Sequence, residues 1–207
     1  MEYLDIYDEE GNYLGKEDRR IVHRDALWHN TVHCWLYDTK GNVYFQIRRE
    51  EGTLYTTASG HVQAGETIKE AFGREIEEEI GINIEYDKAE PVEIVHFVLD
   101  RENKDGSVFR DRAFANVYVY DFEGNSNEFN YDENELRGLI KINAKEALEI
   151  LKNQKGQAKA TYITRIDNQI VEEEKNIEFK DFLINNGETG IGKYGKVLEK
   201  IIELTEN

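Results

Sequence analysis

The sequence predicts a mixed α/β sandwich, in which helices pack on a β-sheet around one core. Runs of alternating or β-branched apolar residues outnumber the stretches with helical periodicity, and the helical stretches interrupt the strand-like runs. Because a sheet and a helix each bury one face, elements interspersed in this way favour a layered sandwich.

The expected strands are apolar runs bounded by turn-forming residues. Residues 40–42, Lys-Gly-Asn, supply one turn signal between them. Residues 104–107, Lys-Asp-Gly-Ser, supply another, with the Asp-Gly pair of a tight hairpin. The strands expected in chain order are Tyr3–Tyr7, Thr31–Tyr37, Val43–Ile47, Val92–Leu99, Phe114–Tyr120 and Leu136–Ile142.

Helical periodicity predicts three helices, at Ile68–Ile80, Ala144–Leu151 and Val197–Leu204. After the second of these the chain becomes polar, and a further β-like run follows at Thr161–Ile166. We therefore expect a domain over residues 1–155 that begins with a hairpin at about 1–28. Residues 156–207 are expected to be a C-terminal appendage of the same domain.

The composition excludes one class of ligand. Asp and Glu number 43 against 26 Lys and Arg, which gives a formal net charge of -17. Duplex nucleic acid is bound through its phosphates by a basic surface, so it is not an expected partner. A phosphate-bearing ligand would have to be small and held by local arginines or by a metal ion.

Cysteine content and hydropathy predict a cytoplasmic protein. Cys34 is the only cysteine, which rules out an intramolecular disulfide and zinc sites that need two or four cysteines. The acidic start, MEYLDIYDEE, has neither the basic nor the apolar segment of a secretion signal. No apolar run approaches the length that spans a bilayer, so no membrane is expected as a partner.

The helix expected over Ile68–Ile80 carries two kinds of acid. Successive residues of an α-helix are rotated by roughly 100°, so the apolar residues of this segment form one arc that faces the core. Glu75 and Glu79 project into that arc, and Glu78 lies at its edge. The acids that point away from it are Glu70 and Glu77.

A carboxylate that faces a core needs a positive partner, because its desolvation costs several kcal/mol or more. Two sources of positive charge fit Glu75 and Glu79: arginines in a structural ion-pair network, or divalent cations. Carboxylates at positions i, i+3 and i+4, here Glu75, Glu78 and Glu79, lie close enough to share hard ions such as Mg²⁺ or Mn²⁺.

The loop before this helix favours the metal. It is bracketed by Gly60 and Gly65, so backbone amides and carbonyls can approach a ligand where the chain enters the helix. The whole stretch, GHVQAGETIKEAFGREIEEEIGI, matches every defined position of the Nudix box. The chain therefore resembles Nudix hydrolases, and the resemblance implies a Nudix-type α/β/α sandwich with a central mixed β-sheet.

The resemblance also implies an activity. Nudix proteins mostly hydrolyse a diphosphate linked to another moiety, often a nucleoside, by water attack on phosphorus with Mg²⁺ or Mn²⁺. Metal ions suit this reaction because they neutralise the diphosphate and lower the pKa of the attacking water. We expect such a hydrolase here, acting on a nucleoside diphosphate derivative or a related small diphosphate.

By the same resemblance, Glu75, Glu78 and Glu79 are the expected catalytic metal ligands, and the carbonyl of Gly60 is a further one. Glu66 and Arg74 are expected to form an ion pair that holds the loop on the helix. The general base is either a box glutamate or an acid on a distant loop. The loop candidates, each of which also fits an ordinary acidic surface loop, are Glu133 and Glu135.

Outside the box, residues from about Leu4 to Leu151 are similar to the Nudix branch that includes isopentenyl-diphosphate isomerase. In those isomerases, histidines and two glutamates build a metal site, and His23, His29 and His61 stand at the corresponding places. The isomerase cysteine is replaced here by Ser59. An intact box and a missing thiol favour hydrolysis over isomerisation.

The segment that should carry the two isomerase glutamates reads FRDRAF, so Arg110 and Arg112 stand in their place. Three histidines beside two arginines make a poor cation site. The histidines either line a phosphate pocket or are hydrogen-bonded structural residues. The expected substrate-binding residues are Arg48, Arg49, His61, Arg110 and Arg112.

Two alternatives to the hydrolase stay open: a non-catalytic nucleotide- or metabolite-binding module, and an isomerase-like enzyme. The amphipathic segment Val197–Leu204 is compatible with a lid or with a homodimer contact.

Overall fold

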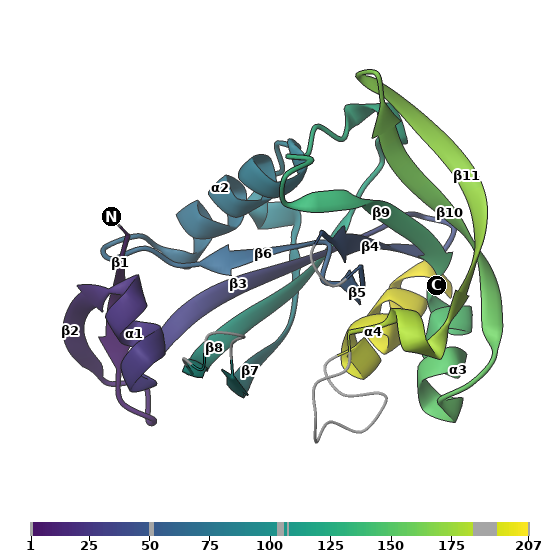
Figure 1. The fold of residues 1–207 in the computed structure, drawn as a ribbon. Helices are drawn as coiled ribbons and strands as arrows, with labels where there is room; N and C mark the ends of the chain where they lie inside the picture. The colour runs from purple at the N-terminus through teal and green to yellow at the C-terminus, as the bar shows by residue number, and fades with distance from the viewer. Residues whose placement is uncertain (1, 50–51, 103–105, 107, 184–193, 207) are drawn as a thin grey trace.

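The computed structural model describes residues 2–49, 52–102, 106, 108–183 and 194–206. Within them the chain forms an 11-stranded sheet and four α-helices (Figure 1). The strands are β1 Tyr3–Tyr7, β2 Tyr13–Asp18, β3 Trp28–Tyr37, β4 Asn42–Arg48, β5 Leu54–Tyr55, β6 Ala58–His61, β7 Glu90–Glu102, β8 Val108–Asp121, β9 Leu136–Asn143, β10 Gln157–Ile166 and β11 Gln169–Glu178. The helices are α1 Arg19–Asp25, α2 Ile68–Ile80, α3 Ala144–Asn153 and α4 Tyr194–Glu206, and short 3₁₀ turns lie at Tyr86–Lys88, Ser126–Glu128 and Phe179–Asp181.

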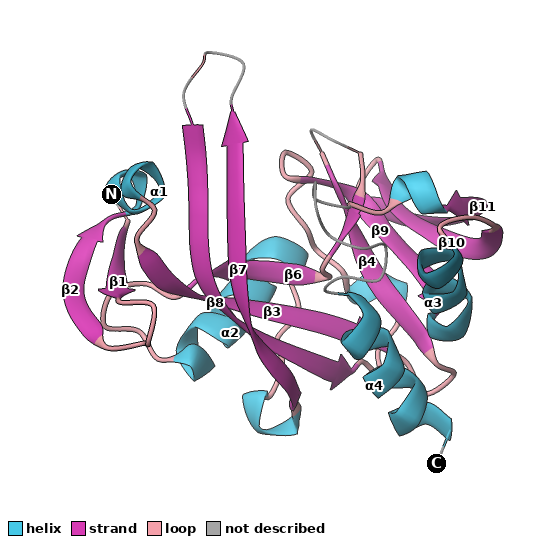
Figure 2. Ribbon diagram, turned by 90° about the horizontal axis from the view of Figure 1, so that it is seen from below, coloured by secondary structure: helices cyan, strands magenta, loops and turns pink. Residues whose placement is uncertain are grey.

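The sheet is mixed, as the sequence predicts, and β3 lies at its centre. β3 pairs in parallel with β8, from His29 opposite Ala113 to Tyr37 opposite Asp121. It pairs antiparallel with β1, β4 and β6. On one side the sheet continues through β4 in the order β9, β10, β11, and on the other side β2 pairs with β1. β5 pairs with β4, and β7 pairs with β8 as a long hairpin that projects from the body (Figure 2).

Two hydrophobic cores lie on opposite faces of the sheet, so the predicted α/β/α sandwich is confirmed (Figure 1). Alternation along β3 produces them, because successive side chains of a strand point to opposite faces. Cys34 and Leu36 pack toward α2, whereas Trp35 and Tyr37 pack toward α3 and α4. Cys34 is 1% exposed and belongs to the core.

Helix α2 has the bounds that the sequence predicts, because both of its ends carry strong signals. Thr67 caps the first turn in a capping box with Glu70, and Gly81 ends the helix in the left-handed conformation with φ 72°. The buried residues of α2 are Ala71, Phe72, Ile76 and Ile80. Burial of each larger apolar side chain contributes about 1.5–3 kcal/mol, which fixes the rotation of the helix against the sheet.

Residues after 155 continue the sheet and the core. β10 pairs with β9, and β11 pairs with β10. In α4, Val197, Leu198 and Ile201 are buried in the same core cluster as α3. None of the helices in the described residues combines the length and apolar content needed to cross a membrane.

The sequence did not predict several short or polar elements. The N-terminal segment contains the β1–β2 hairpin and also α1, a helix of 7 residues capped by Asp18. β5 and β6 have 2 and 4 residues, too few to show a period. β11 has a mostly exposed, acidic sequence. Lys104, Asp105 and Ser107 of the predicted hairpin turn lie outside the described residues.

Candidate active site

A cavity of about 990 Å³ opens beside the predicted metal-binding helix. Helix α2 contributes Glu75, Glu78 and Glu79 to its lining, and β6 contributes Gly60 and His61. The β7–β8 hairpin contributes alternate residues to the lining, and the loop before β9 contributes others. These residues are Phe97, Leu99, Arg101, Phe109, Asp111, Asp132, Asn134 and Glu135.

Gly60 lies in direct contact with the Glu75 side chain. A Cβ atom added at residue 60 would overlap the carboxylate of Glu75. β6 pairs with β3, with Gly60 opposite Val32, so the backbone at this position is fixed by the sheet. Glycine is therefore required for the close approach of the Glu75 carboxylate to the backbone.

The Glu79 carboxylate points into the protein, as the helical rotation predicts. The backbone N–H of Ser59 donates to Glu79 Oε2 at 2.7 Å, and Gln46 Nε2 donates to the same oxygen at 3.4 Å. Burial raises the pKa of Glu79 to about 8, and the nearby charges of Glu75 and Glu135 add to this effect. Burial also raises the pKa of Glu75.

Arg74 connects the loop to the helix. Its Nε and Nη2 donate to the two oxygens of Glu66, each at 2.8 Å, and Nη2 also donates to the carbonyl of His61 at 2.9 Å. Its Nη1 donates to Glu75 at 2.6 Å and to Glu78 at 3.1 Å. The ion pair expected between Glu66 and Arg74 is thus present in the structure, and Arg74 also lies beside two of the glutamates.

The three glutamates of α2 that line the cavity carry oxygen ligands of the type that Mg²⁺ and Mn²⁺ prefer. The Gly60 carbonyl stays a predicted further ligand. The ion pairs of Arg74 reach Glu66, Glu75 and Glu78. Glu79 faces inward with a strongly raised pKa, so its charged form needs a positive partner, which a cation between α2 and β6 would supply.

Of the predicted phosphate-binding residues, Arg48, Arg49 and His61 line the cavity. The guanidinium of Arg48 lies over the ring of Tyr55, 5.4 Å from its centroid. Arg49 Nη1 donates to the carbonyl of Glu133 at 2.6 Å, so this arginine also fixes the loop before β9.

The two acids of that loop are placed differently. Glu135 lines the cavity, whereas the lining does not include Glu133. The Glu133 contact just described involves its backbone carbonyl rather than its carboxylate. Of the two loop candidates for the general base, Glu135 is the one that the fold brings to the cavity.

The lining of the cavity does not include Arg110 or Arg112, which the sequence analysis expects to bind substrate. Alternation along β8 places Phe109 and Asp111 in the lining and the two arginines on the other face. Arg112 pairs with Asp100 at 2.8 Å, and Arg110 Nη1 donates to the carbonyl of Arg24 at 2.9 Å.

Asp111 is therefore a site residue that the sequence reasoning missed. Its Oδ1 lies 3.5 Å from Nε2 of His29. Burial lowers the pKa of His29 to about 4 and raises the pKa of Asp111 to about 6. Alternation along β8 would have predicted it, because Asp111 lies on the same side of the strand as Ala113 and Ala115, and both alanines are buried.

The fold and the acidic helix beside the cavity define a Nudix-type α/β/α hydrolase. The protein-family model of the NUDIX domain matches residues 27–163. An uncharacterized Nudix hydrolase of Clostridium acetobutylicum is 32% identical over 161 residues, which cover 74% of this chain and 75% of that protein. The chain belongs to the Nudix family and is a hydrolase that acts on phosphorus anhydrides.

More distant relatives agree with this assignment. Nudix hydrolase 3 of Arabidopsis thaliana is 30% identical over 125 residues, which cover 57% of this chain and only 16% of that protein. A crystal structure of a Deinococcus radiodurans protein superimposes with a TM-score of 0.53 at 21% identity, over 73% of this chain and 89% of that one. The last similarity supports the fold.

Proposed function

We propose that this Nudix hydrolase is a Mg²⁺- or Mn²⁺-dependent pyrophosphohydrolase of a nucleoside diphosphate derivative or a related small diphosphate. The observation that carries the proposal is the inward-facing pair of carboxylates, Glu75 against the Gly60 backbone and Glu79 against the Ser59 amide. Glu75 pairs with Arg74, whereas the ion pairs of Arg74 do not reach Glu79, whose buried charge is costly unless a cation binds beside it.

Each residue of the site has a distinct role in this proposal. Glu75, Glu78 and Glu79 would hold the ion, which when bound neutralises diphosphate charge and makes bound water more acidic. Ser59 orients Glu79 through its backbone N–H. Glu66 acts on the chemistry only through Arg74, because it holds the guanidinium in place with two hydrogen bonds.

Substrate phosphates would be held by arginines in the lining of the cavity. Arg48 and Arg49 follow one another at the end of β4 and both line the cavity. Charge-assisted hydrogen bonds from guanidinium groups are strong and match phosphate geometry. Glu135 lies in the same lining, and in this proposal it would be the loop acid that accepts a proton from the attacking water.

The proposal includes a small-molecule partner and a cytoplasmic location. Homodimer formation stays a prediction.

A substrate panel tests the proposal. We expect the wild-type protein, with Mg²⁺ or Mn²⁺, to release a phosphate-containing product from at least one nucleoside diphosphate derivative, nucleotide sugar, dinucleoside polyphosphate or prenyl diphosphate. EDTA should abolish the release. Glu78→Gln should lose this activity, while Glu77→Gln, on the exposed side of the same helix, should keep it. Equal rates for the two variants, or no turnover anywhere in the panel, would contradict the proposal.

A further inference from the structure

The imidazole of His33 lies in the cavity, between the glutamates of α2 and the arginines at the end of β4. Alternation along β3 points the side chains of Thr31 and His33 to the cavity, which both residues line. The intervening Val32 is buried in the core toward α2. None of the roles assigned above falls to His33, although an imidazole N–H is a good hydrogen-bond donor.

One side of His33 is connected to the glutamates through β6. His33 lies opposite Ser59 in the antiparallel pairing of β3 with β6. The side chains of directly opposite residues lie on the same face of a sheet, with Cβ atoms about 4.5–5.5 Å apart. The backbone N–H of Ser59 donates to Glu79 Oε2 at 2.7 Å. Only Ser59 therefore separates the imidazole from the inward-facing carboxylate of Glu79.

The other side of His33 is connected to an arginine that is proposed to bind phosphate. The centroids of the His33 and Tyr55 rings are 6.2 Å apart, and the two rings meet edge to face. The guanidinium of Arg48 lies over the same tyrosine ring, 5.4 Å from its centroid. Tyr55 thus joins the imidazole to the arginine at the end of β4.

A second chain of contacts links the same groups. Tyr55 of β5 lies opposite Gln46 of β4, and Gln46 Nε2 donates to Glu79 Oε2 at 3.4 Å. All the residues of both chains line the cavity. They form one continuous part of the lining, which we call the floor, from the Glu79 carboxylate to the Arg48 guanidinium. His33 belongs to this floor.

The place of the floor indicates what lies on it when substrate binds. A diphosphate has two adjacent anionic groups. If one is held beside the glutamates and the other by Arg48, the link between them passes over the floor. Acidic residues, Asp132 and Glu135, line the same cavity, and the whole chain has a formal net charge of -17. Phosphate oxygens bound there need hydrogen-bond donors, and an imidazole N–H is one.

We propose that His33 binds the substrate by donating a hydrogen bond to its diphosphate, between the glutamates of α2 and Arg48. The inference rests on the proposed hydrolysis of a diphosphate and adds a substrate-binding residue to it. The described lining contains one other imidazole, that of His61. Its Nε2 lies 3.1 Å from His23 Nε2, and its Nδ1 lies 3.9 Å from Glu2 Oε1, so both of its nitrogens face protein groups.

Two substitutions separate hydrogen bonding from packing at this position. His33→Phe keeps an aromatic ring against Tyr55 and loses the donor, whereas His33→Gln keeps an N–H donor and loses the ring. With a diphosphate that the wild type hydrolyses, kcat/KM should fall by about 10- to 100-fold in His33→Phe, as expected when a hydrogen bond to a charged group is lost. His33→Gln should stay within about fivefold of the wild type. The control is His96→Phe, at an exposed position of β7 outside the lining, which should match the wild type.

Binding of methylenediphosphonate, a diphosphate analogue whose bridge cannot be hydrolysed, tests the contact without turnover. With Mg²⁺ present, isothermal titration calorimetry should show similar binding to the wild type, His33→Gln and His96→Phe. Binding to His33→Phe should be about tenfold weaker or more. Circular dichroism checks that each variant is folded. If His33→Phe does not fold, His33→Leu, which also lacks a donor, replaces it.

The outcomes separate this inference from the proposed function. Wild-type hydrolysis and wild-type binding of the analogue in the variant without a donor would overturn the role of His33 and leave the hydrolysis intact. Equal losses in His33→Phe and His33→Gln would also overturn it, because they indicate packing. No binding of the analogue to the wild type would overturn it as well. Selective loss of binding in His33→Phe, without turnover of any substrate, would support the contact and contradict the hydrolysis.

Discussion

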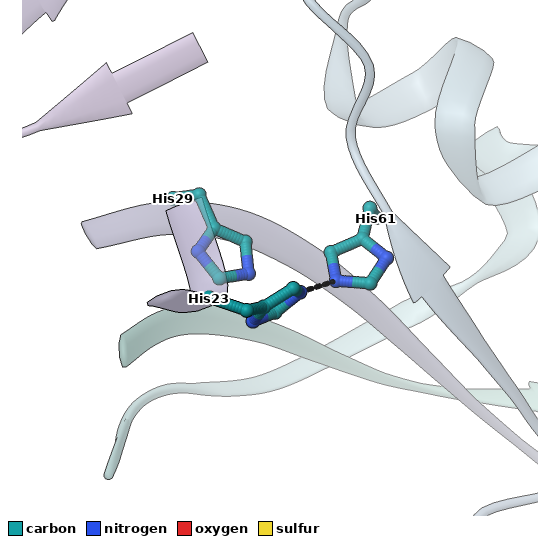
Figure 3. A group of neighbouring side chains, drawn as sticks. All are labelled: His23, His29 and His61. Carbon is teal, nitrogen blue, oxygen red and sulfur yellow. Dashed lines mark hydrogen bonds between the residues drawn. The ribbon is translucent and has the colours of Figure 1, made fainter. Parts of the chain in front are cut away.

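The carboxylates of α2 and the three imidazoles near them are built in different ways. Glu75, Glu78 and Glu79 come from neighbouring turns of α2, so a single helix sets their spacing. The rings of His23, His29 and His61 come from α1, β3 and β6, so their grouping depends on how separate elements pack (Figure 3). A site on one helix can be predicted from the sequence more directly than one assembled from several elements.

Glu79→Gln should have the largest effect on the carboxylate side of this comparison. The change removes an inward-facing ligand charge, and metal stabilisation of phosphoryl transfer contributes several kcal/mol, so kcat/KM should fall by about 10³-fold. Steady-state hydrolysis with Mg²⁺ measures this loss. Activity within about threefold of wild type would show that Glu79 is not a ligand.

Gly60→Ala should reduce activity by about 10²-fold, because the added Cβ overlaps the Glu75 carboxylate and forces it to move. Gly73→Ala is the matched control in α2. A Cβ there meets no atom within 4 Å, so activity should persist and stability should rise by about 0.5–1 kcal/mol. Equal kinetics for the two alanine variants would exclude a role for the Gly60–Glu75 contact.

Arg48→Gln should raise KM about tenfold and leave kcat nearly constant, since the lost interaction with phosphate contributes to binding in both ground and transition states. The control is Arg24→Gln, an exposed residue of α1 that pairs with Asp25. A fall in kcat at constant KM would instead place Arg48 in the chemical step.

The smallest effect concerns stability without divalent ions. The pKa of Glu79 is raised by burial to about 8, whereas the unfolded carboxyl titrates near 4.5. Between these values the folded state binds more protons, so stability falls as the pH rises from about 5 to 8. Glu79→Gln should remove this dependence and stabilise the metal-free protein at pH 8 by on the order of 3 kcal/mol.

Thermal unfolding in EDTA at several pH values measures this effect. Addition of Mg²⁺ should restore stability at pH 8 in the wild type and not in the variant. If the stability of the wild type and of Glu79→Gln depends on pH in the same way, the buried charge of Glu79 does not destabilise the folded state.

The two clusters also differ in how far the sequence could predict them. The rotation of one helix suffices to point Glu75 and Glu79 inward, and the capping signals at Thr67 and Gly81 fix the bounds of α2. The position of Asp111 depends on which face of β8 it occupies. Without that alternation, the segment FRDRAF predicts that Arg110 and Arg112 lie at the site instead of Asp111.

Other features stay hidden from sequence for similar reasons. A strand as short as β5 shows no periodicity, and the acidic residues of β11 mask its pairing with β10. The grouping of His23, His29 and His61 follows from the sequence only through the resemblance to the isomerase branch, and the structure brings the three rings together. The boundary near residue 155 stays a prediction.

Anomalous diffraction from crystals soaked in Mn²⁺ would test most directly that the glutamates of α2 hold the metal ion. We expect a Mn²⁺ peak among Glu75, Glu78 and Glu79. The absence of Mn²⁺ from these glutamates would contradict the account.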